Sequence, residues 1–196
     1  MQARGVVCAS FIALVLCVVS SWAQVSQYDF DDGDLSAWEP LLGEWTAQEG
    51  AYLQADASTP AYRCSVTGEP WHEGTIEADA TALQYNKNGN VGASFGIMVK
   101  YLDEKNWCAA RFGSYNACSL LVVAPEGQVL RLGHFEPEVG RPYHPKVILR
   151  NGLIALIVDG TAIAILEDPF PDQTGRPGLF TETHCSFDNV KINRTQ

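Results

Sequence analysis

Two dipeptides in the C-terminal third, Asn151-Gly152 and Asp159-Gly160, constrain the fold more than any other feature of this sequence. Asn-Gly and Asp-Gly are favoured in two-residue β-hairpin turns because both turn positions adopt a positive φ. The two dipeptides separate three short apolar or β-branched runs, at residues 146–150, 153–158 and 162–166. We therefore predict a three-stranded antiparallel meander here.

The same pattern of short runs continues through the rest of the chain. After Gln24 no long stretch shows helical periodicity, whereas short alternating or β-branched runs recur between Gly, Asn, Asp and Pro residues. These further runs lie at residues 45–53, 61–66, 74–84, 93–101, 107–113, 117–124, 128–135 and 186–192. So many strands in a chain of 196 residues predict one all-β domain, a two-sheet antiparallel β-sandwich.

The first 23 residues differ from everything that follows. Arg4 gives a positive start, residues 6–19 are almost all apolar, and the small residues Ser21 and Ala23 end the run. This pattern predicts a signal peptide at residues 1–23 and a mature domain at residues 24–196. A membrane anchor is the alternative, but the apolar run is shorter than the roughly 20 residues of a spanning helix. We expect a protein secreted to the periplasm or the extracellular medium, without membrane insertion after cleavage.

The acidic balance of the chain limits its partners. The formal net charge is −10, and loss of the leader removes Arg4 but no acid, which leaves 12 basic and 23 acidic side chains. An acidic surface repels nucleic acid and anionic membranes. We therefore expect no nucleic-acid partner.

Four cysteines remain in the mature chain, an even number in a chain predicted to be exported, where disulfides persist. Cys108 and Cys118 lie about equally far from Gly113, in two runs that resemble the arms of a hairpin, which favours a Cys108-Cys118 pair. Cys64 then pairs with Cys185. The alternative is four buried free thiols, because cysteine is often a small apolar core residue.

Several segments resemble the concanavalin A-like lectin and glucanase superfamily, which includes laminin G-like modules. The matching segments cover residues 28–192, and the sequence reads FDDGDLSAW at 30–38, GEW at 43–45, GAYL at 50–53, FGIMVKY at 95–101, NW at 106–107, VDG at 158–160, GRPGLFT at 175–181 and FDNVKI at 187–192. The resemblance implies a jelly-roll β-sandwich and a bacterial source.

The resemblance leaves three functional classes open, because sugar hydrolases, lectins, carbohydrate-binding modules of the family 66 type and the 3-keto-disaccharide hydrolase domain share this architecture. The favoured interpretation is a non-catalytic module that binds a polysaccharide or a glycoconjugate. The first alternative is a glycosidase-type hydrolase. The second is a structural or adhesion domain that binds protein.

The candidate ligand-binding residues follow from how proteins bind sugars, with aromatic faces against C–H patches and polar groups on the hydroxyls. Strand alternation places Lys100, Trp107 and Arg111 on one relatively polar face. Tyr115 in the adjacent turn and Trp71 in a loop complete the predicted site. The alternative is that these aromatic residues belong to the core, as most aromatic residues of a sandwich do.

Carboxylates suggest two further sites. Glu77 and Asp79 share one face of a predicted strand and resemble a glycosidase acid pair, although a solvated outer face is the alternative. In relatives of this fold a calcium ion often ties the first strand to the last, and Asp31 and Asp188 are the matching carboxylates here. This structural calcium is the only cofactor suggested, and a simple Asx-rich turn is the alternative for Asp31.

Overall fold

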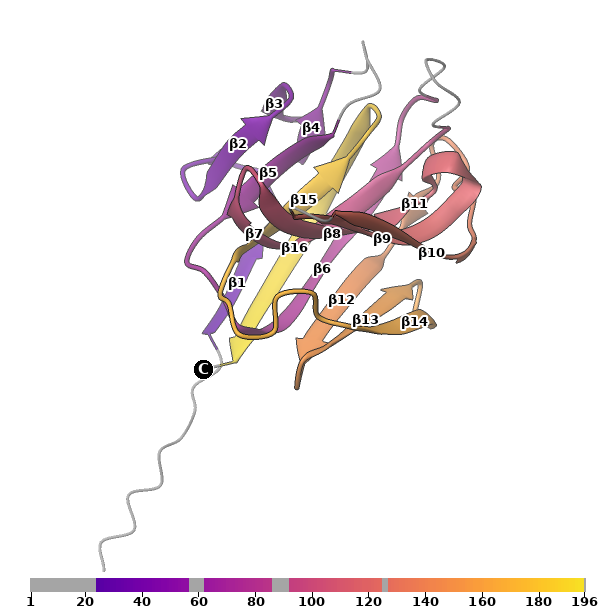
Figure 1. The fold of residues 1–196 in the computed structure, drawn as a ribbon. Helices are drawn as coiled ribbons and strands as arrows, with labels where there is room; N and C mark the ends of the chain where they lie inside the picture. Colours follow the sequence, from indigo (N-terminus) through magenta and orange to yellow (C-terminus); the bar gives the residue numbers. More distant parts are fainter. Residues whose placement is uncertain (1–23, 57–61, 86–91, 125–126, 196) are drawn as a thin grey trace, which may run out of the picture.

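The structure, a computed structural model, describes residues 24–56, 62–85, 92–124 and 127–195. Its strands form two antiparallel sheets packed face to face (Figure 1), so the predicted all-β sandwich is confirmed. The predicted signal peptide, residues 1–23, lies outside the described residues. Among the residues described, no helix has the length and apolar character needed to cross a membrane.

Sheet A is built around the two longest strands. In order across the sheet its strands are β14 (Thr161–Glu167), β13 (Leu153–Val158), β12 (Pro145–Arg150), β6 (Glu73–Ala82), β16 (Cys185–Thr195), β4 (Ala51–Gln54) and β3 (Trp45–Gln48). Two further strands pair with its centre, β1 (Gln24–Tyr28) with β16 and β11 (Pro142–Tyr143) with β6.

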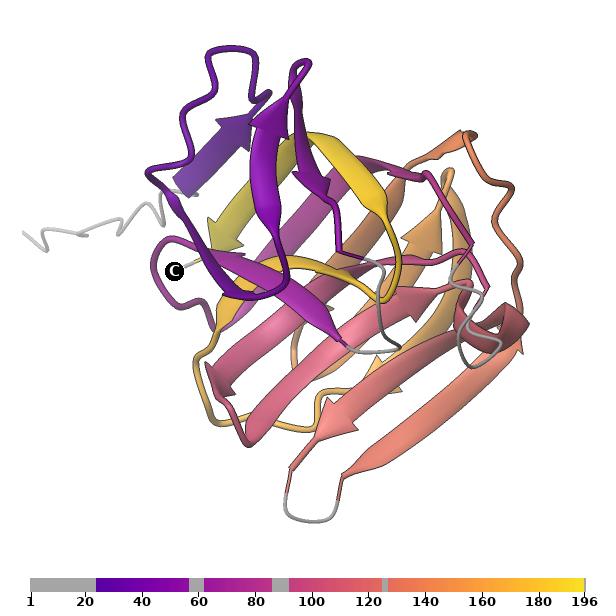
Figure 2. The same ribbon diagram turned by 90° about the horizontal axis from the view of Figure 1, so that it is seen from above.

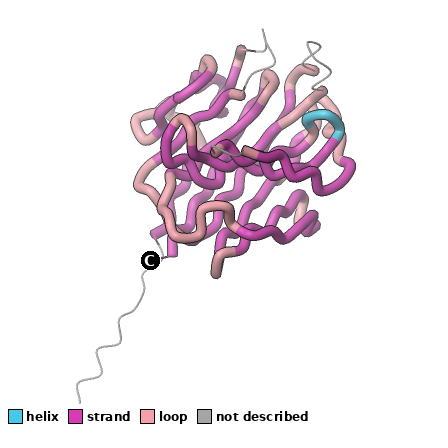
Figure 3. The backbone as a smooth tube through the Cα atoms, in the orientation of Figure 1, coloured by secondary structure: helices cyan, strands magenta, loops and turns pink. Residues whose placement is uncertain are grey.

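Sheet B lies across sheet A, and its strands run at a steep angle to β6 and β16 in Figure 1. In order its strands are β10 (Gln128–His134), β9 (Ala117–Val123), β8 (Asn106–Phe112), β7 (Phe95–Asp103), β15 (Arg176–Thr181), β5 (Arg63–Thr67) and β2 (Trp38–Leu42). A short 3₁₀ turn at Ser114–Asn116 joins β8 to β9 and is the helical segment coloured in Figure 3.

The turns explain why the chain reverses where it does. Asn151-Gly152 and Asp159-Gly160 all have positive φ, from 49° to 75°, which confirms both predicted hairpins. The run predicted at residues 45–53 is instead the hairpin β3–β4, because Glu49 and Gly50 also have positive φ. Glu is a poor marker of such a turn, so the sequence pattern did not separate these two strands.

The main core lies between the two sheets, which form separate layers when the sandwich is viewed from above (Figure 2). Phe95 and Ile97 of β7 belong to the same core cluster as Ile76 of β6 and Leu156 of β13, and all four side chains are fully buried. Truncation of one such side chain to alanine typically costs about 2–5 kcal/mol, so this layer fixes the relative position of the sheets.

The predicted disulfides are wrong, because the four cysteines of the described residues are all buried free thiols. Cys108 lies opposite Val122, and Cys118 lies opposite Phe112, so the hairpin is present but its register separates the two thiols. Cys64 faces outward from sheet B whereas Cys185 lies in the main core. Side chains that point apart cannot be bridged without backbone movement. Burial raises the pKa of the Cys64 and Cys118 thiols to about 12.

Candidate functional site

The outer face of sheet B is unusually apolar. Side chains alternate along each strand, so one set enters the core and the other points outward, where a solvated sheet normally carries polar residues. Here seven apolar residues on the outward side are buried and pack together. This group, the sheet B cluster, consists of Cys64, Val66, Met98, Trp107, Ala109, Leu121 and Phe180.

A buried ion pair adjoins the sheet B cluster. Arg111 has Ser119 as its cross-strand partner, so both side chains point outward, and the Arg111 Nε donates to the Ser119 Oγ at 3.0 Å. The Arg111 Nη1 lies 3.1 Å from the Glu182 Oε1. Arg111 and Glu182 are only 3% and 5% exposed. Because an unpaired buried charge is costly, this pairing holds the guanidinium and the carboxylate in a fixed geometry.

The segment that carries Glu182 is held by a small network of hydroxyl groups. The hydroxyls of Thr181 and Thr183 donate to the backbone carbonyl of Ser94, at 3.0 and 2.9 Å. The backbone N–H of Glu182 donates to the Ser94 Oγ at 3.4 Å. All three hydroxyl residues are fully buried, so the chain beyond β15 has a defined position.

Two partly exposed tyrosine rings border the ion pair. Tyr115 lies in the 3₁₀ turn with a positive φ of 54°, and its ring centroid is 5.8 Å from the Arg111 guanidinium carbon. The Tyr62 ring lies 5.5 Å from Trp107. Burial raises the pKa of the Tyr62 hydroxyl, the charge of Glu182 adds to the rise, and Arg111 opposes it. The Tyr62 ring centroid is also 5.7 Å from that of Phe180, two residues before Glu182, so Tyr62 lies on the same part of the face as the ion pair.

A pocket of about 360 Å³ opens on the same face, beside Trp107. Its lining consists of Leu41, Leu42, Cys64, Tyr101, Glu104 and Trp107. Trp107 and Cys64 also belong to the sheet B cluster, so the pocket continues that apolar surface. The outer face of sheet B thus has an apolar part at this pocket and a polar part at the ion pair.

Of the predicted ligand-binding residues, the structure brings Trp107, Arg111 and Tyr115 together on this face. It does not place Lys100 with them. Between Met98 and Lys100 the register of β7 against β8 shifts, and Lys100 lies opposite Cys108, a core residue. A β-bulge of this kind reverses the side to which the following residues point.

Lys100 therefore points inward, and the prediction that it shares a face with Trp107 is wrong. It is fully buried, and its Nζ lies 2.6 Å from the Asp168 Oδ2. The same Nζ donates to the backbone carbonyls of Phe170 and Gln173, both at 2.8 Å. Lys100 holds the segment after β14 against the sandwich.

Trp71 is likewise a core residue and not part of the face. It is 2% exposed, and its backbone pairs with Gly175. Its Nε1 donates to the Val99 carbonyl at 2.8 Å. Val99 is the residue without a partner in β8 at the bulge, so Trp71 satisfies a carbonyl at the irregularity.

Sequence reasoning missed Glu182, Ser119 and Tyr62. Glu182 lies two residues beyond Phe180 and continues its outward alternation, which was a usable local signal. Its pairing with Arg111 joins residues 71 positions apart, and no local pattern contains that information.

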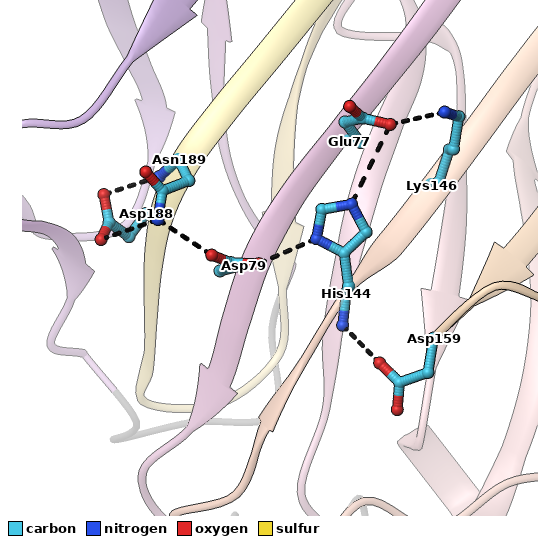
Figure 4. A network of polar contacts seen from close by, with 7 residues as sticks. All are labelled: Glu77, Asp79, His144, Lys146, Asp159, Asp188 and Asn189. Carbon is cyan, nitrogen blue, oxygen red and sulfur yellow. Dashed lines mark hydrogen bonds and ion pairs between the residues drawn. The ribbon is translucent and has the colours of Figure 1, made fainter.

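Glu77 and Asp79, the predicted acid pair, lie on the outer face of sheet A (Figure 4). They do share one face, and their side chains are 19% and 45% exposed. The Lys146 Nζ lies 2.6 Å from the Glu77 Oε2. The His144 Nδ1 lies 2.8 Å from the Asp79 Oδ1, and the Asn189 amide donates to the Asp79 Oδ2 at 2.9 Å. Each carboxylate is thus engaged by neighbouring side chains of a solvated network.

Asp31 and Asp188, the predicted calcium ligands, lie near one another at the edge of this network. Burial raises the pKa of Asp188, the backbone N–H of Asn189 opposes the rise, and the nearby Asp79, Asp31 and Asp29 add to it. Within the described part of the chain, no three His, Cys, Asp or Glu residues are grouped closely enough to hold a metal ion. Calcium binding therefore stays a prediction.

The Asp31 segment has the features of the Asx-rich turn that was the alternative. The Asp34 backbone N–H donates to the Asp32 Oδ1 at 2.9 Å, and the Ser36 N–H donates to the Asp34 Oδ1 at 2.8 Å. Such bonds between side chain and backbone explain the spacing of the acids without a metal.

No model of a known protein family matches the sequence. Solved structures nevertheless resemble this one over most of its length. The carbohydrate-binding module CBM66 from Bacillus subtilis superposes with a TM-score of 0.65 at 17% identity, over 79% of this chain and 94% of that one. The likeness is one of fold, and it agrees with the predicted jelly-roll β-sandwich. SCLam, a non-specific endo-β-1,3(4)-glucanase of family GH16, has a TM-score of 0.62 at 9% identity, over 89% of this chain and 92% of its own.

One curated protein is similar in sequence. The extracellular exo-α-L-arabinofuranosidase of Streptomyces chartreusis is 28% identical over 199 aligned positions, which cover 91% of this chain. The present chain spans only 23% of the length of that relative, so the similarity covers a part of a larger protein.

Proposed function

We propose that this protein is a glycan-binding module that holds a sugar on the outer face of sheet B. The observation that carries the proposal is the buried Arg111–Glu182 pair beside two partly exposed tyrosine rings. Sugar hydroxyls are bound well by charged groups in fixed positions, because hydrogen bonds to charged groups are stronger than neutral ones. The apolar C–H faces of a sugar ring pack on aromatic side chains.

The proposal gives each group a role. Tyr115 and Tyr62 are 46% and 37% exposed, so their rings are available to a ligand from the solvent side. Arg111 and Glu182 supply the polar contacts to the sugar in this proposal, with the guanidinium as donor and the carboxylate as acceptor. Trp107 continues the aromatic surface next to Tyr62.

The comparisons support this function without deciding it. One structural neighbour is named a carbohydrate-binding module, and another is a glucanase. The relative in Streptomyces chartreusis is named an extracellular enzyme, which supports an extracellular bacterial setting for this chain as well. These names fit a polysaccharide or a glycoconjugate as the partner.

A glycosidase that uses Glu77 and Asp79 is the second candidate, since the relative is named an arabinofuranosidase. The surroundings of the pair favour it less, because Lys146 already pairs with Glu77 and the pair lies on an open face. Glu77→Gln should abolish sugar release if this function is correct. Absence of release by the unaltered protein across a broad polysaccharide panel would count against it.

The test of the proposal is polysaccharide retention by affinity electrophoresis and a glycan array, in calcium and in a chelator. Tyr115→Ala should weaken retention at least fivefold without a change in melting temperature. Tyr85→Ala is the matched control, because Tyr85 is exposed to a similar extent, 44%, in a different loop. If the unaltered protein binds no glycan under either condition, the proposal fails and the protein-binding alternative gains weight.

A further inference from the structure

The pocket beside Trp107 has a chemistry that the proposed sugar site does not explain. Leu41 and Leu42 of β2, Trp107 of β8 and Tyr101 of β7 line a space of about 360 Å³. Among the described residues of the lining, Glu104 is the one charged side chain. The pocket also lies against the sheet B cluster, so the surface beneath it is apolar.

This lining is poorly matched to a bare sugar ring. A sugar carries hydroxyl groups around its edge, and each one that is buried without a partner costs roughly 1–3 kcal/mol. Of the lining side chains that the structure describes, those of Glu104 and Tyr101 carry the strong hydrogen-bonding groups. An apolar group would gain from burial at the same surface.

The aromatic walls narrow the class of ligand. Trp107 and Tyr101 have flat faces, and aromatic rings pack on such faces in stacked or edge-to-face arrangements. Arg176 lies over the Tyr101 ring, with its guanidinium carbon 5.7 Å from the centroid, and it forms an ion pair with Glu39. The volume is near the lower end of the usual range for ligand pockets, about 300–1,000 Å³, which fits one ring and its linker.

We infer that this pocket binds an aryl group carried by the glycan, such as an aromatic acyl ester on a sugar hydroxyl. The inference rests on the proposed function, because Trp107 lines the pocket and also contacts Tyr62, which lies next to the Arg111–Glu182 pair. A sugar at the ion pair and an aryl group in the pocket occupy neighbouring parts of one face. The protein then discriminates aryl-substituted glycans from bare ones.

The experiment uses the mature chain and three small probes, measured by isothermal titration and saturation-transfer NMR. The probes are methyl 4-hydroxycinnamate, its saturated-ring analogue and methyl β-D-glucopyranoside. The aromatic ester should bind, and the other two should bind at least tenfold more weakly. Absence of aromatic-ester binding at millimolar concentration overturns the inference, and so does equal binding of the saturated analogue.

Leu42→Asp tests the location. Leu42 is 54% exposed at the pocket, so an added carboxylate should lower aromatic-ester affinity at least tenfold while the fold is kept. Leu153→Asp is the matched control, because Leu153 is 45% exposed on β13 of the opposite sheet. Equal loss of binding in both variants overturns the assignment to this pocket.

The two proposals fail separately. Tyr115→Ala should reduce polysaccharide retention and leave aromatic-ester affinity unchanged, since Tyr115 does not line the pocket. Ester binding without any glycan retention would keep the pocket and contradict the glycan-binding proposal. Retention of a polysaccharide without ester binding would do the reverse.

Discussion

The outer faces of the two sheets differ in how their charged side chains are exposed to water. On sheet A, Glu77, Asp79, His144 and Lys146 form an exposed polar network (Figure 4). On sheet B the outward side chains are apolar and buried, and the charges are confined to the enclosed Arg111–Glu182 pair. The difference teaches that the number of charged residues on a face and the burial of those charges are separate properties. The proposed binding face is the one whose charges are removed from water.

The largest expected effect is a difference in the stability lost when a buried ion pair, Arg111–Glu182, and a partly exposed one, Lys146–Glu77, are each broken. Arg111→Ala removes the guanidinium that pairs with the buried Glu182 carboxylate, which should destabilise the protein by about 3–5 kcal/mol. Lys146→Ala removes the cation of a partly exposed pair and should cost less than about 1 kcal/mol. Urea unfolding of both variants measures the difference. Equal losses would contradict the contrast between the two faces.

The next effect concerns Lys100. Because its ammonium group is buried against Asp168, Lys100→Met should destabilise the fold by roughly 3 kcal/mol. At a temperature where the variant is folded, glycan retention should match that of the unaltered protein. A loss of retention without a loss of stability would mean that Lys100 belongs to the binding face after all.

The rates at which the cysteine thiols react test the difference between the outer face of sheet B, where Cys64 lies, and the core, where Cys185 lies. All four described cysteines are buried, and burial raises the pKa of Cys64 to about 12, so reaction with a disulfide reagent at pH 8 should be slow in the folded state. Cys64 lines the pocket and should be the first to react, and an aromatic ester should slow it further. Peptide mapping after timed labelling measures the order. Prior reaction of Cys185 would contradict the assigned sides.

The smallest effect tests the edge of the sheet A network. Because burial raises the pKa of Asp188, ionisation of this group in the folded state opposes folding, and the penalty disappears as pH falls below its ordinary value near 3.8. In a chelator, Asp188→Asn should therefore stabilise the protein slightly at pH 7 and have no effect near pH 3. If calcium binds at Asp31 and Asp188, the same variant should lower the melting temperature in calcium.

Local sequence signals predicted the fold well where turn chemistry is explicit. Asn151-Gly152 and Asp159-Gly160 placed two hairpins, whereas the Glu49-Gly50 turn was missed because Glu rarely marks such a turn. Alternation placed Trp107 and Arg111 on one outward face. These features depend on residues close together in the chain.

The rest of the candidate site depends on contacts that local patterns do not contain. Glu182 meets Arg111 through the neighbouring positions of β15, β7 and β8 in sheet B, and that order is set by the whole fold. Trp71 was assigned to a loop at the surface, but its indole N–H is needed at a carbonyl inside the sandwich. The predicted Cys108-Cys118 disulfide was wrong for a related reason. The hairpin was predicted correctly, but its register does not place the two cysteines opposite each other.

The β-bulge at Val99 changes which side chains of β7 point into the core and which point outward. Before the bulge, the inward side chains of β7 are those of Phe95, Ile97 and Val99. After it, Lys100 points inward and Tyr101 points outward to the pocket. If β7 instead kept a regular alternation through Val99, Lys100 would point to solvent and Tyr101 would point into the core. The single extra residue of the bulge thus decides at the same time which charge is buried and which aromatic ring lines the outer pocket.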